Sequence, residues 1–256
     1  MPMTMPEIDQ CLRQLRLSGV RATLETRILQ AQSSNQAFIE TLSLLLQDEM
    51  DRRRSTLIDR RYKQSGLDEK VTLAEFDWGF NPKIPRQACF ELHTLKFIAA
   101  GENAQLIGKP GTGKSHVAKA IAYNAALQGY RVRYVESDPF LTRCAWIAAE
   151  QRDAELEPII AADLLVLDDL FLAKTLPDGA AGVLQTIIHQ RYKLRRSVIV
   201  TSNRIVQDWG SYLGDNTTAS TILDRLMHHS HQLEFDGKSY RLKEAAEKLA
   251  RPPKSS

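Results

Sequence analysis

The eight residues from Gly108 to Ser115 have the types and spacing needed to bind phosphate. They read Gly-Lys-Pro-Gly-Thr-Gly-Lys-Ser and match the pattern G-x-x-x-x-G-K-[ST] of phosphate-binding loops. In such loops glycine lets backbone N–H groups approach phosphate oxygens, Lys114 reaches the β- and γ-phosphates, and the Ser115 hydroxyl ligates Mg²⁺. The sequence therefore predicts a site for ATP and Mg²⁺. The nucleotide-binding candidates are Gly108, Lys109, Pro110, Gly111, Thr112, Gly113, Lys114, Ser115 and the next residue, His116.

The segments on either side of this loop are typical of a strand and a helix. Residues 104–107 are expected to form a short buried strand, and residues 115–128 form an alanine-rich amphipathic pattern. The N-terminal end of that helix would direct its dipole at the phosphates. This context favours a nucleotide site over a glycine-rich turn without function.

Two carboxylates follow a second apolar strand, Leu164–Leu167. Such a run is typical of a buried parallel strand, and ligands bind where parallel strands end. We expect Asp168 to hold Mg²⁺ through water, and Asp169, on the other side of the strand line, to orient the attacking water or accept its proton. The alternative is a strand followed by an Asp-rich turn. The spacing from the phosphate loop favours the catalytic interpretation.

A third strand, predicted over 198–201, is followed by Ser202 and Asn203. Asn203 is expected to lie beside the first two motifs, where its amide can bond the γ-phosphate or the attacking water. The alternative is a simple turn-forming asparagine.

Strands and helices alternate from residue 86 to residue 236, which predicts an α/β domain. Alternation of this kind implies a five-stranded parallel sheet flanked by helices. The predicted strands are 105–108, 132–136, 164–168, 198–201 and 232–235, and the predicted helices are 115–128, 139–150, 180–193 and 217–229.

The rest of the chain divides into three further parts. Residues 1–70 have helical spacing of apolar residues, interrupted at residues 18–20, and predict a small all-helical domain. Residues 71–85 form an aromatic, proline-containing connector, and residues 237–256 form a C-terminal tail that we expect to be disordered from 251 onward.

Composition is that of an ordinary globular protein. The 256 residues are 43% hydrophobic and 25% charged, with a net charge of +3 that does not by itself imply nucleic-acid binding. The three cysteines are widely separated and odd in number, which argues against disulfides or a zinc site. No secretory segment or apolar run long enough to span a membrane is evident, so we expect a cytoplasmic protein.

Together these motifs resemble the AAA+ ATPases, and within them the DnaC/IstB group. The chain is most similar to the IstB-like ATP-binding helpers of insertion-sequence transposition. This resemblance covers almost the whole chain. It is carried by residues 108–115, 164–170, 201–203, 222–229 and 237–241.

The resemblance implies roles for two arginines. Arg225 lies where the group has an arginine finger, which enters a neighbouring subunit's ATP site and stabilises charge on the transferring phosphoryl group. A surface arginine of a helix is the alternative. Arg241 corresponds to a sensor in its own subunit, but the 20 residues from Gly237 to Ser256 are too few for the usual helical lid. We therefore expect a lid that is reduced or absent, and adenine contacts from the connector near Ile84 and Arg86.

Two groups of arginines are candidates for binding DNA. Arg52, Arg53 and Arg54 belong to a run with six basic residues in twelve positions, although nearby acids would equally suit a solvated helix face. The second group lies on or after the second predicted strand, where related initiator-type proteins place elements that face the central pore. An oligomer would repeat such patches along a duplex. The second group is Arg131, Arg133, Arg143 and Arg152.

Other residues that could suggest a site are expected to be structural. His228, His229 and His231 lack the spacing of a metal site. Trp78, Trp146 and Trp209 are expected to pack in the core rather than to stack on bases.

The resemblance implies a DNA-dependent ATPase that assembles with itself on double-stranded DNA when ATP is bound. Such a helper selects target DNA and recruits and stimulates its cognate transposase. A replicative helicase loader shares the same core and differs in its partner. A nucleotide-gated DNA scaffold without hydrolysis is a third possibility, against which the Asp168–Asp169 pair argues.

Overall fold

The computed structural model describes residues 2–173, 176–213 and 216–250, with no side-chain description for 216–218 and 250. The chain forms two compact units, Met1–Arg60 and Arg61–Ser256. The predicted tail from 251 onward lies outside the described residues.

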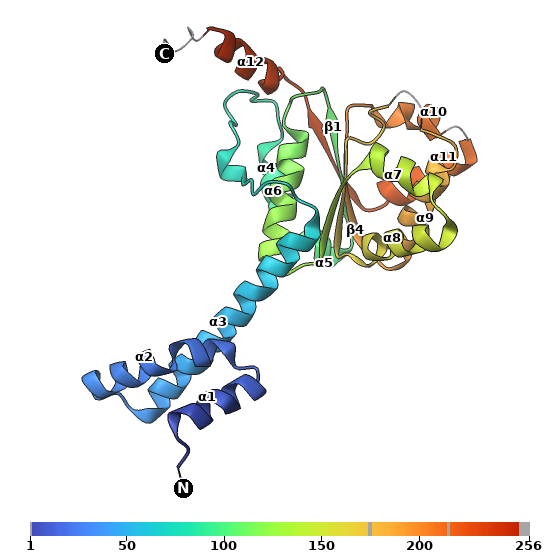
Figure 1. The fold of residues 1–256 in the computed structure, drawn as a ribbon. Helices are drawn as coiled ribbons and strands as arrows, with labels where there is room; N and C mark the ends of the chain where they lie inside the picture. Colours follow the sequence, from blue (N-terminus) through green and yellow to red (C-terminus); the bar gives the residue numbers. More distant parts are fainter. Residues whose placement is uncertain (1, 174–175, 214–215, 251–256) are drawn as a thin grey trace, which may run out of the picture. The chain divides into compact units, whose positions relative to one another are not determined.

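The N-terminal unit consists of helices, as the apolar spacing predicts. They are α1 (Met5–Gln14), α2 (Ser18–Ser34) and the part of α3 (Phe38–Ser65) that precedes Arg61 (Figure 1). The buried carboxylate of Glu49 on α3 accepts hydrogen bonds from the backbone N–H groups of Gly19 (2.6 Å) and Val20 (3.3 Å). These N–H groups have no partner within the first turn of α2, so Glu49 caps this helix. Residues 18–20, predicted as an interruption, are thus the start of α2.

The second unit is built on a five-stranded parallel sheet, which confirms the predicted fold. The strand order is β2-β3-β4-β1-β5, and every neighbouring pair is parallel. The elements are η1 Leu73–Glu75, α4 Arg86–His93, α5 Lys96–Ala100, β1 Asn103–Gly108, α6 Lys114–Leu127, β2 Val132–Glu136, α7 Ser137–Trp146, α8 Ala149–Ala161, β3 Leu164–Asp168, α9 Ala180–Lys193, β4 Ser197–Ser202, η2 Val206–Asp208, α10 Trp209–Leu213, α11 Asn216–Met227, β5 Ser230–Phe235 and α12 Tyr240–Ala250.

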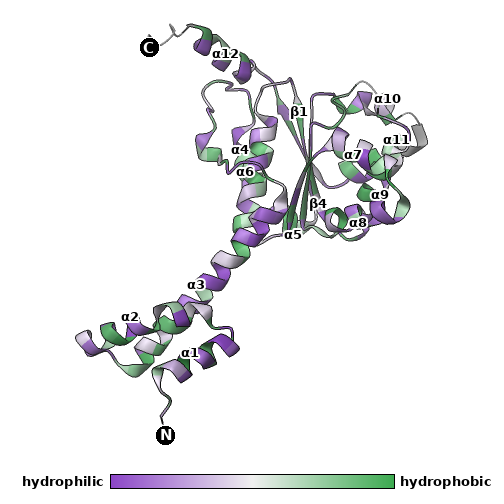
Figure 2. Ribbon diagram, viewed as in Figure 1, coloured by the Kyte–Doolittle hydropathy of each residue, from purple (hydrophilic) through white to green (hydrophobic). Residues whose placement is uncertain are grey.

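Helices cover both faces of this sheet (Figure 1). The side chains of β3 alternate: Leu164 and Val166 pack in the core that includes α4, α5 and α6, whereas Leu165 and Leu167 pack in the core that includes α7 to α11. This alternation follows from the two-residue period of a strand. Because both faces are covered, β3 is apolar along its whole length. Figure 2 shows hydrophobic and hydrophilic residues on different parts of α6 and α9, as expected of helices with one face on a sheet.

Two predicted segments differ from the structure. The region predicted as one helix over 139–150 contains most of α7 and the first two residues of a separate helix, α8. Residues 240–250, assigned to a tail, form the amphipathic helix α12. No helix in the described ranges has both the length and the apolar character of a membrane span.

Candidate nucleotide-binding site

The phosphate-binding motif connects the carboxyl end of β1 to the N-terminus of α6, as predicted. Lys114 is the first residue of α6 and is 5% exposed, and its Nζ donates to the carbonyl oxygens of Gly108 and Lys109 at 2.8 Å each. Burial lowers the pKa of Lys114, while the charges of Asp169 and Asp168 raise it. The ammonium group is therefore held inside the loop, within electrostatic range of both acids.

Gly111 and Gly113 are required by their backbone angles and by close contacts that the motif alone does not reveal. Gly111 and Gly113 have φ angles of 75° and 98°, a region that favours glycine. A Cβ on Gly111 would lie 2.1 Å from Oγ of Ser239, and one on Gly113 would lie 2.4 Å from the ring of Phe76. The loop is thus in contact with the connector and with the C-terminal segment.

Asp168 is fixed by two hydroxyl groups at the end of β3. It is 4% exposed, and its two carboxylate oxygens accept hydrogen bonds from Thr201 Oγ1 and Tyr134 Oη, both at 2.6 Å. Charge-assisted bonds of this kind are about twice as strong as neutral ones. Burial and the charge of Asp168 raise the pKa of the Tyr134 hydroxyl, which keeps it a donor. The carboxylate therefore has one defined orientation at the carboxyl edge of the sheet.

Asp169 departs from the strand geometry that we expected. Its φ of 50° is left-handed, so the alternation of β3 ends at Asp168. Its backbone N–H donates to Thr201 Oγ1 (2.9 Å). Burial and the adjacent Asp168 raise the pKa of Asp169, and the charge of Lys114 lowers it. The Asp169 carboxylate is thus within electrostatic range of Lys114.

Asn203 follows β4, which pairs with β3 and brings its carboxyl end to the same edge. The Oδ1 atom of Asn203 is buried and has no hydrogen-bond partner among the described residues. Buried polar atoms of this kind are normally bonded. An unpaired acceptor after β4, at the carboxyl edge of the sheet, is consistent with a bond to a ligand or a water molecule.

The residues present fit a magnesium nucleotide. Mg²⁺ prefers oxygen ligands and is usually bound by one or two protein groups together with phosphates and water. Ser115, half-buried on the first turn of α6, and Asp168 provide such oxygens. His116 instead lies against the connector, with Nε2 at 3.2 Å from the Thr72 carbonyl oxygen and its ring 5.5 Å from that of Phe76.

The two arginines implied by the resemblance lie in different places. The charge of Arg241 lowers the pKa of both Lys114 and Asp169, so Arg241 lies within electrostatic range of the phosphate loop. Arg225 lies near the end of α11, and its carbonyl oxygen accepts a bond from Asn103 Nδ2 (3.3 Å) at the amino end of β1. From Asn103 to Gly108 the strand advances five residues, roughly 17 Å at about 3.3 Å per residue. The Arg225 backbone thus lies at the sheet edge opposite its own phosphate loop.

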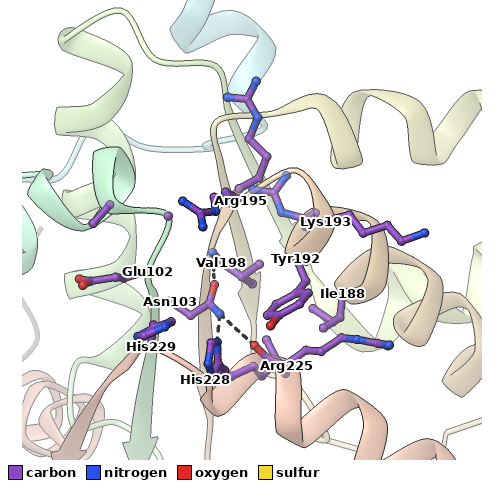
Figure 3. A pocket seen from close by; sticks show the side chains of 15 residues that line it. Glu102, Asn103, Ile188, Tyr192, Lys193, Arg195, Val198, Arg225, His228 and His229 are labelled. Atoms are coloured by element: carbon purple, nitrogen blue, oxygen red, sulfur yellow. Dashed lines mark hydrogen bonds between the residues drawn. The ribbon is translucent and has the colours of Figure 1, made fainter.

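Arg225 lines a cavity of about 500 Å³ at that edge (Figure 3). In Figure 3 its side chain lies near Ile188 and Tyr192 of α9. Its guanidinium group has no hydrogen-bond or ion-pair partner within the described ranges. An unpaired arginine at the edge of the domain is available to another molecule.

The candidate DNA-binding arginines of the second unit are bound to the protein itself. Arg131 pairs with Asp163 (3.0 Å), and Arg133 donates to the carbonyl oxygen of Gln64. The other two also have partners: Arg143 pairs with Glu155 (3.0 Å), and Arg152 donates to the carbonyl oxygens at the end of α7, the shortest bond being 2.7 Å to Cys144. These bonds reduce the donors that each group can offer to phosphate.

The arginine run of the N-terminal unit is more accessible. Arg52, Arg53 and Arg54 are all exposed on α3. Arg52 donates to Ser18 Oγ (3.1 Å) and Arg53 pairs with Glu49 (2.6 Å). The predicted pairing with acids on the same helix face thus holds for Arg53, whereas Arg54 is without a partner in the described part of the chain.

The remaining histidines and tryptophans divide into packed and exposed residues. The described residues contain no group of three His, Cys, Asp or Glu side chains arranged to hold a metal ion. Trp78 packs on Phe76, and Trp209 is fully buried against Phe171. The packing prediction is wrong for Trp146, which is 78% exposed at the end of α7.

Sequence reasoning missed Tyr134 and Thr201 as site residues. Both hold Asp168, and both depend on β2 and β4 being the neighbours of β3. Each is a residue with a hydroxyl group near the carboxyl end of a strand that neighbours β3. This pattern can indicate a site residue only once the strand order is known.

Known proteins share this sequence and fold. Residues 10–248 match the family model described as IstB-like ATP binding protein. An ATP-binding protein of insertion sequence IS21 from Pseudomonas aeruginosa is 34% identical over 94% of this chain and 90% of its own length. An insertion-sequence ATP-binding protein from Mycobacterium tuberculosis is 34% identical over 92% of this chain and 94% of its length.

Two solved structures support the fold. The crystal structure of DnaI has a TM-score of 0.55 at 22% identity and covers 66% of this chain and 89% of its own. AMPPCP-bound DnaA from Aquifex aeolicus has a TM-score of 0.53 at 24% identity and covers 72% of this chain and 56% of its own. At these identities the likeness is one of fold, the AAA+ fold. From the family match and the relatives over nearly its full length, we conclude that the chain belongs to the IstB-like ATP-binding proteins.

Proposed function

We propose that this protein is a DNA-dependent ATPase that helps a transposase of its insertion sequence. It would assemble on double-stranded DNA when ATP is bound, select the target DNA, and recruit and stimulate the transposase. Family membership and relatives named for insertion sequences support this role. The observation that carries the catalytic part is the topology: β1 and β3 are strands of one parallel sheet, so Lys114 after β1 and Asp168 and Asp169 at the end of β3 lie at the same edge.

The proposed chemistry assigns each residue one task. Lys114 stabilises negative charge on the β- and γ-phosphates, and Asp169 orients the attacking water or accepts its proton. Asn203 offers its unpaired Oδ1 to that water. Ser115 and Asp168 would hold Mg²⁺, which neutralises phosphate charge when bound.

The position of Arg225 supports the proposal that hydrolysis requires assembly. Its distance from its own phosphate loop suits an arginine finger that acts in a neighbouring subunit. A guanidinium group supplied in this way accelerates phosphoryl transfer by about 10³-fold or more. ATP turnover would then depend on the head-to-tail contact that assembly on DNA provides.

For DNA contact we favour the N-terminal unit. Arg52 and Arg54 are exposed, whereas Arg131, Arg133, Arg143 and Arg152 bond to the protein itself. Such contacts would neutralise backbone phosphates, so binding should weaken steeply with added salt.

The Lys114→Ala variant tests this proposal. It should fail to assemble on long duplex DNA with ATP and should release no phosphate, as followed by electron microscopy and a phosphate assay. Assembly and turnover equal to the wild-type protein would refute the mechanism. Normal assembly of the wild-type protein with turnover near zero would instead identify a scaffold, and capture of a replicative helicase rather than the transposase would identify a loader.

A further inference from the structure

The phosphate loop is enclosed by two segments that are far apart in sequence. One is the connector around Phe76 to Ile84, and the other is Asp236–Arg241, which follows β5. We call the connector, the loop and this C-terminal segment together the clasp. Its contacts lie entirely within the second unit.

Asn81 joins the connector to the C-terminal segment. Its Nδ2 donates to the carbonyl oxygen of Lys238 and its Oδ1 accepts from the N–H of Lys238, both at 2.9 Å. The Asn81 residue is 6% exposed, so water competes little for these bonds. A Cβ on Gly237 would lie 2.3 Å from Asn81 Oδ1, so glycine is needed for this close approach. A side-chain amide thus pairs with a backbone peptide across 157 residues of sequence.

The C-terminal segment in turn joins the phosphate loop. The N–H of Tyr240 donates to the carbonyl oxygen of Gly111 (2.9 Å), and Ser239 occupies the space beside Gly111. The ring of Tyr240 also meets that of Phe80 in the connector, at 5.3 Å between centroids. Asn81 thus binds Lys238, and Tyr240, two residues further along the chain, binds the loop through its backbone.

Ion pairs at the rim contribute less than Asn81. Asp236 pairs with Lys109 (2.8 Å) and Lys83 (3.6 Å), whose side chains are 71% and 81% exposed. Exposed pairs contribute little because water screens them. The buried amide of Asn81 is the contact in the clasp that most restricts the C-terminal segment.

We propose that Asn81 is a positioning residue of the nucleotide site. By pairing with Lys238 it holds Tyr240 on Gly111 and thereby places the next residue, Arg241, in the field of Lys114 and Asp169. ATP affinity then depends on a connector residue that does not itself contact phosphate. This inference rests on ATP binding by the family and does not depend on DNA, assembly or the transposase.

The test compares Asn81→Ala with the matched control Asn124→Ala. Asn124 also donates one side-chain bond to a backbone carbonyl, that of His93 (2.8 Å), but it lies in the last turns of α6, away from the loop. ATP binding with Mg²⁺ is measured by titration calorimetry on the full chain without DNA. We expect Asn81→Ala to raise the Kd for ATP about 10-fold, which corresponds to the loss of one or two buried hydrogen bonds. Asn124→Ala should change it less than about 2-fold.

Two further measurements separate positioning from a general loss of structure. Hydrogen exchange should become faster at the Lys238 and Tyr240 amides in Asn81→Ala and stay unchanged in Asn124→Ala. Arg241→Ala should weaken ATP binding in the wild-type background but add little in the Asn81→Ala background, because Arg241 is already displaced there. If Asn81→Ala does not fold, Asn81→Asp keeps the acceptor for the Lys238 N–H, and the same 10-fold loss is expected from removal of the donor.

An ATP Kd for the Asn81 variants within 2-fold of the Asn124→Ala value would overturn the proposal. Fully additive effects of Asn81→Ala and Arg241→Ala would overturn the placement of Arg241. Because these measurements use ATP binding without DNA, their failure differs from a failure of the proposed function, which would appear as normal ATP binding without DNA-dependent turnover.

Discussion

Thr201 links both acids of the site through one hydroxyl group, and its replacement by valine tests whether that link matters. Thr201 Oγ1 donates to Asp168 Oδ1 (2.6 Å) and accepts from the N–H of Asp169 (2.9 Å), and the residue is fully buried. Valine has nearly the same shape but lacks the hydroxyl. The variant therefore loses a charge-assisted bond and leaves a partly buried N–H unpaired.

The expected loss of stability follows from the two hydrogen bonds that the valine variant lacks. Together these losses should lower the free energy of unfolding by about 3 kcal/mol. In a unit of this size that corresponds to a Tm lower by about 6–12 °C. Because Asp168 and Asp169 lose their common anchor, ATP turnover should fall about 10- to 100-fold.

Thr201→Ser is the matched control because it keeps the hydroxyl and removes one methyl group, worth about 1 kcal/mol. Scanning calorimetry gives Tm, and phosphate release with saturating ATP and DNA gives turnover. The serine variant should retain most of the turnover. If the valine and serine variants agreed in Tm within 2 °C and in turnover within about 2-fold, the hydroxyl link would have no functional role.

Arg191→Met should lower the free energy of unfolding by about 3–5 kcal/mol in chemical denaturation, because its buried guanidinium group donates to four backbone carbonyls. As a control, Arg195→Met replaces an exposed arginine nearby and should change the free energy of unfolding by less than about 0.5 kcal/mol. Equal losses of stability in the two variants would contradict this prediction. Burial raises the pKa of Asp169, and its proposed role requires an ionised carboxylate. As the pH is lowered, turnover should therefore begin to fall before the ordinary aspartate pKa of 3.8 is reached. Burial lowers the pKa of Lys114, and ATP binding requires its positive charge. As the pH is raised, ATP affinity should therefore begin to fall before the ordinary lysine pKa of 10.5 is reached. A pH–rate profile with an acid limb at or below 3.8, or ATP binding unchanged up to pH 10.5, would argue against these assignments.

Local pattern was sufficient to predict the strands and the phosphate loop. The strand β3 is a short apolar run, and it is apolar on both faces because helices cover both faces of the sheet. The glycine spacing of the loop is likewise local. These features depend on neighbours in sequence, so they could be predicted before the strand order was known.

The contacts that complete the site depend on topology. Tyr134 and Thr201 bond Asp168 because β2 and β4 flank β3, and nothing in either strand alone indicates this order. The pairing of Asn81 with Lys238 spans 157 residues. The partners of charged side chains also depend on topology: Arg131 pairs with Asp163, and Arg152 donates to carbonyl oxygens at the end of α7.

We propose that each ATP site is completed by Arg225 of a neighbouring subunit. Mixing Asp169→Asn protein with Arg225→Ala protein on DNA tests this proposal, with ATP turnover as the measurement. Each variant should bind ATP and assemble but be inactive alone, because one lacks the carboxylate that acts on the attacking water and the other lacks the arginine finger. In an equal mixture about a quarter of head-to-tail interfaces combine an intact Asp169 with an intact Arg225. We expect turnover near a quarter of the wild-type value, whereas a mixture as inactive as either variant alone would show that Arg225 does not act in a neighbouring subunit.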